Sequence, residues 1–114
     1  MSIYKIPAPD APGEEWGRLA VSLPGWRWMP GMLDQKNRRY HVTVPHELCD
    51  AVWPDPDDGA TGGCLLELAG APHRLLPTVE AWLSGKPVEG ITSLGRAVIV
   101  DVRDQWGRWP GGEG

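Results

Sequence analysis

The chain has 114 residues, seven tryptophans, no phenylalanine and a formal net charge of −4. A chain of this length folds as one small domain with a single modest core. The negative charge argues against binding to nucleic-acid backbones, which depends on basic patches, and no apolar run approaches the roughly 20 residues of a membrane-spanning helix.

The cellular compartment is indicated by two missing features, a secretory signal and a disulfide framework. The N-terminus has no apolar region of the kind found in a secretory signal. Two cysteines, Cys49 and Cys64, are too few for a disulfide framework. We therefore expect a cytoplasmic protein whose thiols are reduced.

Three regions are predicted along the chain: an extended arm over residues 1–9, a single domain over 10–109 and a flexible tail over 110–114. The domain begins with a helix that has Asp10 as its N-cap, Pro12 near its start and Pro24 at its end. One face of this helix is apolar, because its hydrophobic residues have the spacing i, i+3, i+4 and i+7: Trp16, Leu19, Ala20 and Leu23.

The next segment combines a Trp-rich stretch with a strand pattern. Residues 23–32 read Leu-Pro-Gly-Trp-Arg-Trp-Met-Pro-Gly-Met. Farther on, Tyr40, Val42 and Val44 alternate with polar residues, which predicts a half-buried strand. Residues 34–39 would connect it to an antiparallel neighbour.

In the second half of the chain, two segments are ambiguous between helix and strand. A helix is predicted over residues 59–68, with Asp58 as its cap and Gly70 as its stop. Alternation over residues 76–83 slightly favours a strand, although a helix starting at Pro77 also fits. The longer stripe over 93–109 favours a helix, capped by Thr92 or Ser93, over the strand that the run Ala97–Val100 would form.

Together these elements predict an α+β fold. Two to three short antiparallel strands would pack against two to three helices in a single domain.

The Trp-rich stretch, residues 23–32, resembles a segment of small, uncharacterised proteins encoded by bacteriophages and prophages. Residues 58–68 resemble an Asp-capped helix of the same proteins, with Gly59 and Gly62 where proline and valine are common. Residues 93–109 resemble their C-terminal helix more weakly. The resemblance implies a phage or prophage origin and a small α+β sandwich, but it transfers no activity and no functional residue.

Residue types suited to zinc are present, but their spacing is not that of a known zinc module. The four candidates are His46, Cys49, Cys64 and His73. Cys64 falls in an apolar helical run, where cysteine behaves as a small hydrophobe. His46 and Cys49 would be neighbours on a helix, yet no third group is available to orient them for catalysis. We therefore expect no metal, no cofactor and no enzymatic activity.

Aromatic and methionine side chains are the remaining candidates, because such residues, with arginine, are typical of interface centres. They either form core or offer a binding surface to a partner: Trp26, Arg27, Trp28, Met29, Met32, Trp106 and Trp109. The leading hypothesis is a phage accessory protein that binds a host protein, for example to inhibit a host defence system. The alternatives are a protein, such as a homodimer, that sequesters a nucleotide-like small molecule by stacking on tryptophan, and a virion component.

Overall fold

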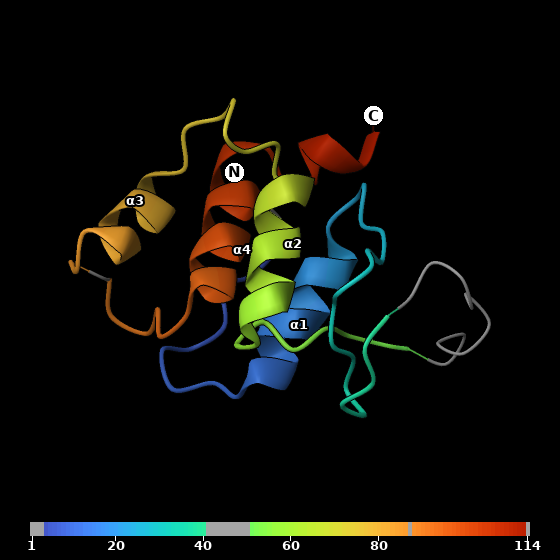
Figure 1. The fold of residues 1–114 in the computed structure, drawn as a ribbon. Coiled ribbons are helices and arrows are strands. Elements are labelled where there is room, and N and C mark those ends of the chain that lie inside the picture. The colour runs from blue at the N-terminus through green and yellow to red at the C-terminus, as the bar shows by residue number, and fades with distance from the viewer. Residues whose placement is uncertain (1–3, 41–50, 87, 114) are drawn as a thin grey trace.

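The computed structural model describes residues 4–40, 51–86 and 88–113, and this part of the chain is helical (Figure 1). Four α-helices follow one another: α1 (Gly13–Ser22), α2 (Gly59–Leu68), α3 (Pro77–Leu83) and α4 (Leu94–Gln105). The segment that we predicted as a tail contains a 3-10 helix, η2 (Pro110–Glu113), which packs against α2. Among the helices described here, none is long and apolar enough to cross a membrane.

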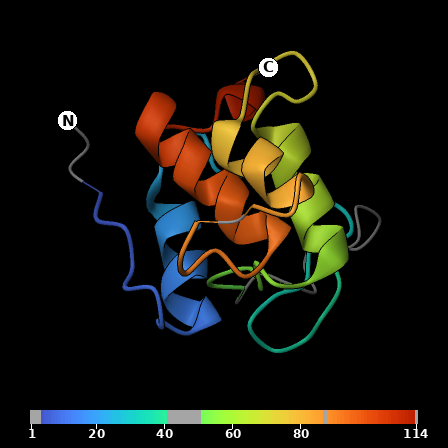
Figure 2. The same cartoon turned by 90° about the vertical axis from the view of Figure 1, so that its left-hand side faces the viewer.

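Helix α4 lies at the centre of the core, and the other three α-helices all contact it. In Figure 2, α4 runs between α1 on one side and α2 on the other, with α3 in front. Ala97, Val98, Ile99 and Val102 are completely buried. Helix α4 is covered on several sides, so its apolar residues are not confined to one face but are consecutive in the sequence, as is typical of a buried helix.

The predictions of α2 and α4 are confirmed, including the caps Asp58 and Ser93, although α4 ends at Gln105 and does not reach the predicted residue 109. The hydroxyl of Ser93 accepts a hydrogen bond from the backbone N–H of Arg96 at 3.3 Å. The carboxylate of Asp58 accepts one from the N–H of Thr61 at 3.0 Å. Gly70 follows α2 with a φ of +90°, as a residue that ends a helix in the left-handed conformation should.

The apolar face of α1 is also confirmed, but its predicted cap is wrong. Trp16, Leu19 and Ala20 are buried in the core. The helix begins at Gly13, so that Pro12 and not Asp10 occupies the N-cap position, and no side chain caps it. Glu14 and Glu15 lie in the first turn, where the helix dipole favours negative charge.

The predicted α+β fold is wrong, because the part of the chain that the structure describes is all-α and contains no β-strand. The connection expected over residues 34–39 is present, but strand-like pairing there is limited to two isolated bridges, Leu33–Arg39 and Asp34–Pro54. Residues 41–44 of the predicted strand lie outside the described residues.

The carboxylate of Asp34 closes this turn. Asp34 is buried, and it accepts hydrogen bonds from the backbone N–H groups of Lys36 and Arg38 at 3.0 and 2.8 Å. The side chain of Arg38 also binds it, at 2.6 Å. Side-chain bonds of this kind satisfy backbone donors within the turn. Backbone hydrogen bonds flank it, from the N–H of Tyr40 to the carbonyl oxygen of Met32 at 2.8 Å and from the N–H of Gly31 to that of Tyr40 at 3.0 Å.

The strand favoured over residues 76–83 is also wrong, because Pro77–Leu83 form α3. The helix has no side-chain cap of its own at Leu76. Instead, the buried carboxylate of Asp101 in α4 accepts hydrogen bonds from the backbone N–H groups of Thr78 and Val79, both at 3.0 Å. The groups that would otherwise be unsatisfied at the start of α3 are thus bound by a residue 22 positions or more away in the chain.

Residues 54–58 pass between α1 and α4, and two glycines make room for them. A Cβ atom on Gly17 of α1 would clash with the carbonyl oxygen of Pro54, and one on Gly95 of α4 would clash with that of Pro56. The loop then binds α4 through Asp57, whose carboxylate accepts two hydrogen bonds from Arg96, each of 2.9 Å. The spacing between α1 and α4 is therefore set by backbone contact.

Opposite effects are expected from two glycine-to-alanine substitutions in helices. Gly95→Ala should lower the free energy of unfolding by about 1–3 kcal/mol, because α4 must move away from Pro56. Gly63→Ala in α2 should raise it by about 0.5–1 kcal/mol, because nothing lies within 4 Å of the added Cβ and alanine favours the helix. Urea denaturation measures both; a neutral Gly95→Ala would contradict the close approach.

The cap that α4 provides for α3 can be tested with two aspartates of the same helix. Asp101→Ala should lower the free energy of unfolding by about 1–3 kcal/mol, because the buried N–H of Val79 and the partly buried N–H of Thr78 lose their acceptor. Asp104→Ala is the control, since Asp104 is exposed and pairs only at the surface with Arg103, which predicts a loss below about 1 kcal/mol. Equal losses in both variants would show that Asp101 does not cap α3.

Candidate functional site

The Trp-rich segment, residues 23–32, belongs largely to the core. Met29 and Met32 are buried, with 8% and 0% of their surface exposed. Trp26 and Trp28 are partly buried and pack against the core, whereas Arg27 is exposed. The segment therefore offers little apolar surface to a partner.

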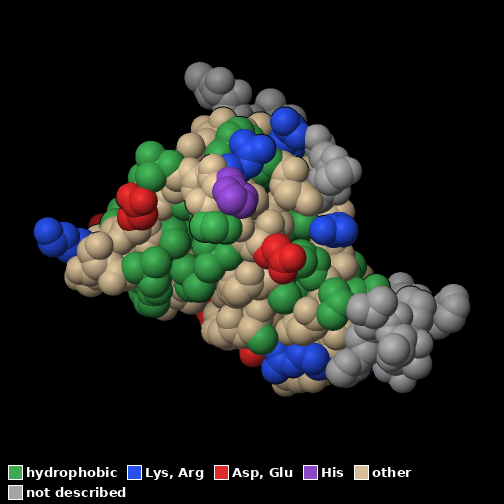
Figure 3. All heavy atoms as spheres, turned by 45° about the horizontal axis from the view of Figure 1, so that its top comes forward, with side chains coloured by type: hydrophobic (Ala, Val, Ile, Leu, Met, Phe, Trp, Pro, Cys, Tyr) green, Lys and Arg blue, Asp and Glu red, His purple; other side chains and the backbone are tan. Residues whose placement is uncertain are grey.

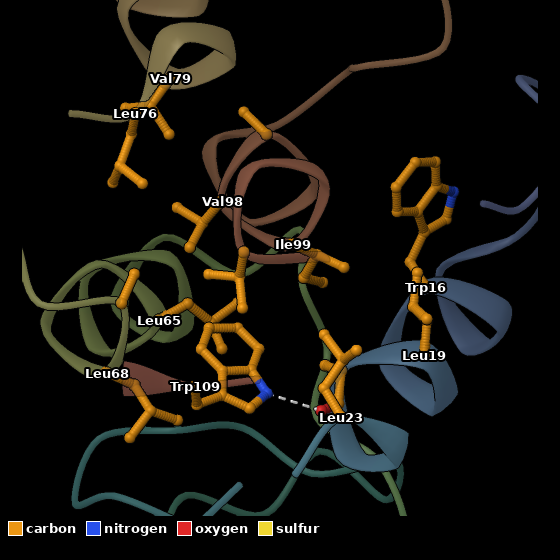
Figure 4. Packing of buried hydrophobic residues seen from close by; sticks show 14 of the residues in the cluster. Trp16, Leu19, Leu23, Leu65, Leu68, Leu76, Val79, Val98, Ile99 and Trp109 are labelled. Carbon is orange, nitrogen blue, oxygen red and sulfur yellow. Dashed lines mark hydrogen bonds between the residues drawn. The ribbon is translucent and has the colours of Figure 1, made fainter. Parts of the chain in front are cut away.

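The chain end holds this segment in place through Trp109. The indole of Trp109 is fully buried, and its Nε1 donates a hydrogen bond to the carbonyl oxygen of Ala20 in α1 at 2.8 Å (Figure 4). Its ring meets that of Trp26 edge-on, with 5.7 Å between centroids, and Trp26 meets Trp28 in the same way at 5.5 Å. Edge-on aromatic contacts of this kind stabilise a core beyond the area that they bury.

Close packing of the Trp109 backbone against the end of α1 requires a glycine at position 25. The backbone N–H of Trp109 donates to the carbonyl oxygen of Pro24 at 2.7 Å. Gly25 has a φ of +87°, and a Cβ on it would lie 2.7 Å from the carbonyl oxygen of Trp109. The Pro-Gly pair thus ends α1 and also makes room for the C-terminal backbone.

The other C-terminal tryptophan points elsewhere. Trp106 is partly buried, and the guanidinium of Arg74 lies over its ring at 5.4 Å from the centroid. Trp106 and Trp109 therefore do not form one helix face, as α4 ends at Gln105. Of the seven residues predicted as interaction candidates, only Arg27 is exposed.

Of the four zinc candidates, the structure describes Cys64 and His73, and the surroundings of Cys64 disfavour a metal ligand or a nucleophile. The thiol of Cys64 donates to the carbonyl oxygen of Pro30 at 3.3 Å. Burial raises the pKa of Cys64, and the carboxylates of Glu67 and Asp58 raise it further, so the thiolate that binds metals is disfavoured. His73 is exposed.

No cluster of three or more potential metal ligands occurs within residues 4–40, 51–86 and 88–113. The other two zinc candidates, His46 and Cys49, lie outside these ranges.

The acidic residues that follow Pro54 are bound within the fold. Burial opposes the ionisation of Asp57, but hydrogen bonds from Arg96 outweigh it and lower the pKa of this carboxyl. Likewise, hydrogen bonds from Arg39 and Thr61 outweigh burial and lower the pKa of Asp58. Arg39 binds Asp58 at 2.6 Å and also donates to the carbonyl oxygen of Gly31 at 3.0 Å. These carboxylates join α2 and α4 to their neighbouring loops.

Exposed apolar surface is concentrated on α3 and the loops on either side of it. Leu75, Leu83 and Val88 are 66%, 71% and 58% exposed, and Trp82 beside them is partly buried. We call these four residues the α3 surface. Figure 3 shows hydrophobic side chains gathered at the left of the view, over α3 and toward α2. Val52, with 47% exposure, belongs to a distant loop.

Helical spacing in the sequence indicates the α3 surface, but the prediction of a strand over residues 76–83 does not make use of it. Leu76, Val79 and Leu83 have the i, i+3, i+7 spacing of a helix face. The first two are buried, but Leu83 continues the same stripe as the last residue of α3 and is left uncovered. Clustered exposure of large apolar side chains marks an interaction site more often than scattered exposure does.

Comparison of the chain with protein-family models, with curated proteins and with solved structures finds no match. The geometry of the chain itself is therefore the basis for assigning a function.

Acid should weaken the ion pair between Asp57 of the loop and Arg96 of α4 within a defined pH range. Because the pKa of Asp57 is lowered in the folded state, its contribution to stability is full at neutral pH. It decreases as the pH falls below the unfolded-state value of about 3.9 and is lost once the pH passes below the folded-state value.

Asp57→Asn tests this pH dependence. The substitution should lower the free energy of unfolding at pH 7 by about 1–3 kcal/mol, because the guanidinium of Arg96 then faces a neutral amide in place of a carboxylate. The stabilities of the variant and the wild-type protein, measured by urea denaturation, should converge as the pH falls from 5 toward 3. Two parallel curves across that range would contradict the assignment.

Proposed function

We propose that the chain is a non-enzymatic protein-binding module whose binding surface is the α3 surface. The observation that carries the proposal is the exposure of Leu83, the last residue of α3, and of Leu75, which lies in the loop just before the helix. A few well-packed side chains supply most of the binding energy in protein interfaces, tryptophan prominent among them, and the α3 surface contains Trp82. The α3 surface therefore replaces the Trp-rich segment as the interface, since that segment packs inward.

The partner in this proposal is a host protein. The resemblance of residues 23–32 to phage-encoded proteins supports a phage or prophage origin, and inhibition of a host defence system in the host cytoplasm is the corresponding role. The chain's net charge of −4 supports a protein partner over a nucleic acid.

The use of the buried charges supports a binding role over a catalytic one. Asp34, Asp101 and Arg96 are the charged residues that the described part of the chain buries. Asp101 caps α3, Arg96 binds Asp57, and Asp34 closes its own turn. Each of these side chains makes hydrogen bonds that hold the backbone or a loop in place. A catalytic group, by contrast, must be positioned so that it can reach a substrate.

A differential pull-down from bacterial lysate tests the proposal. The baits are the wild-type chain, the surface variants Leu75→Ser and Leu83→Ser, and the control Val52→Ser, which changes an exposed valine far from α3. We expect one set of proteins to be enriched by the wild type and by Val52→Ser. Both α3-surface variants should bind it at least about tenfold more weakly, the loss expected for interface anchors.

Two outcomes would overturn the proposal. One is that no protein is enriched over a bait-free control. The other is that the enriched proteins bind Leu75→Ser and Leu83→Ser as well as the wild type. Both substituted leucines are more than half exposed, so their replacement should leave the fold intact, and circular dichroism of each bait verifies this.

A further inference from the structure

The α3 surface borders a cavity of about 230 Å³, which lies between α3, α4, α1 and the N-terminal arm. Val88 belongs both to the α3 surface and to the lining of the cavity, and Thr78 of α3 lines it as well. The exposed lining residues mark its mouth: Pro9, Val88 and Glu89. The fully buried ones form its floor: Trp16 and Ile91. The cavity thus opens at the edge of the proposed binding surface.

The walls of the cavity are held in place by the fold. At the start of the arm, the side chain of Arg103 donates a hydrogen bond to the carbonyl oxygen of Tyr4 at 2.6 Å. At its end, Pro9 lies against Gly90, where a Cβ would come within 2.7 Å of the Cα of Pro9. On the other side, the cap that α4 provides fixes the first turn of α3, including Thr78. The cavity is therefore formed before a partner binds, which reduces the cost of ordering on binding.

The size of the cavity suits one large side chain. An apolar cavity of about 150 Å³ holds benzene, and pockets for drug-sized molecules begin at about 300 Å³. The volume here lies between these values. The cavity therefore admits a phenylalanine or a leucine side chain, and pockets that take one such side chain are typical of the centres of protein interfaces.

The charge at the mouth of the cavity determines what accompanies this side chain. Among the described residues that line the cavity, Glu89 is the only charged one, and no ion pair within the described ranges involves it. A carboxylate beside an apolar opening attracts a cationic residue of a partner and repels an anionic one. Lysine and arginine are therefore the side chains that fit next to the inserted one.

We infer that the partner protein inserts one large apolar side chain into this cavity and pairs a neighbouring lysine or arginine with Glu89. This insertion rests on the proposed function, because the cavity and the α3 surface share Val88 and are covered by the same partner. The inserted side chain contacts the apolar floor, and the basic residue stays at the exposed mouth. A segment with a basic residue beside an aromatic or aliphatic one is thus the kind of partner that this site fits.

Three small molecules with the same phenyl group test the site without the partner: 2-phenylethylammonium, 2-phenylethanol and 3-phenylpropanoate. Binding is followed by the methyl signals of Ile6 and Ile91, both of which line the cavity, in the 13C-labelled protein. We expect all saturable shifts at these methyl groups, with the cation bound about two- to fivefold more tightly than the alcohol, as for an exposed ion pair. The anion should bind most weakly.

Variants assign the two parts of the interaction. Glu89→Gln should abolish the preference for the cation and leave binding of the alcohol unchanged. Val100→Phe fills the cavity and should weaken all three probes at least about fivefold, whereas Val52→Phe, on a distant loop, should not. If Val100→Phe does not fold, nuclear Overhauser effects from 2-phenylethanol to Ile6 and Ile91 in the wild type replace it. Absence of a saturable shift at millimolar probe, or a cation preference that survives in Glu89→Gln, would overturn the inference.

The differential pull-down separates this inference from the proposed function. Glu89→Lys should bind the enriched proteins at least about fivefold more weakly than the wild type does, whereas Glu67→Lys, which reverses an exposed charge on α2, should bind them equally. Undiminished binding by Glu89→Lys, together with loss of binding by Leu83→Ser, would overturn the inference and leave the proposed function standing. Enrichment of no protein would overturn both.

Discussion

Helix α4 has to be covered on several sides, and the rest of the structure follows from this requirement. Its residues Ala97, Val98, Ile99 and Val102 are completely buried. A chain of 114 residues has few elements with which to cover such a helix, and the described part uses its three other α-helices: α1, α2 and α3 each contact α4. Burial of this apolar surface is the main favourable term in folding, so α4 organises the domain.

Polar side chains fix the position of the covering elements, and most of them act over long distances in sequence. Asp101 of α4 caps α3, and Arg96 of α4 binds the loop at Asp57. Trp109 binds the end of α1 through its indole N–H. Buried polar groups of this kind cost stability unless they are paired, and here each pair also specifies which element lies against which.

The sequence predicts the helices that carry their own signals and fails where the signal is supplied from elsewhere. Helices α2 and α4 are capped by the residues immediately before them, Asp58 and Ser93, and both were predicted. For α3, the alternation over residues 76–83 favours a strand over the helix starting at Pro77, because the cap of this helix is Asp101, a residue from a distant part of the chain. For the same reason the α3 surface was missed, whereas tryptophan content drew attention to residues that turn out to be core.

Helix α4 is the innermost helix of the domain, whereas α3 is the outer one, held by few buried residues and free to present its surface. Native-state hydrogen exchange followed by nuclear magnetic resonance tests this directly. We expect the amides of Ala97–Val102 to exchange slowest, at the rate of global unfolding, and those of Glu80–Leu83 to exchange faster. Equal or faster exchange in α4 would contradict this expectation.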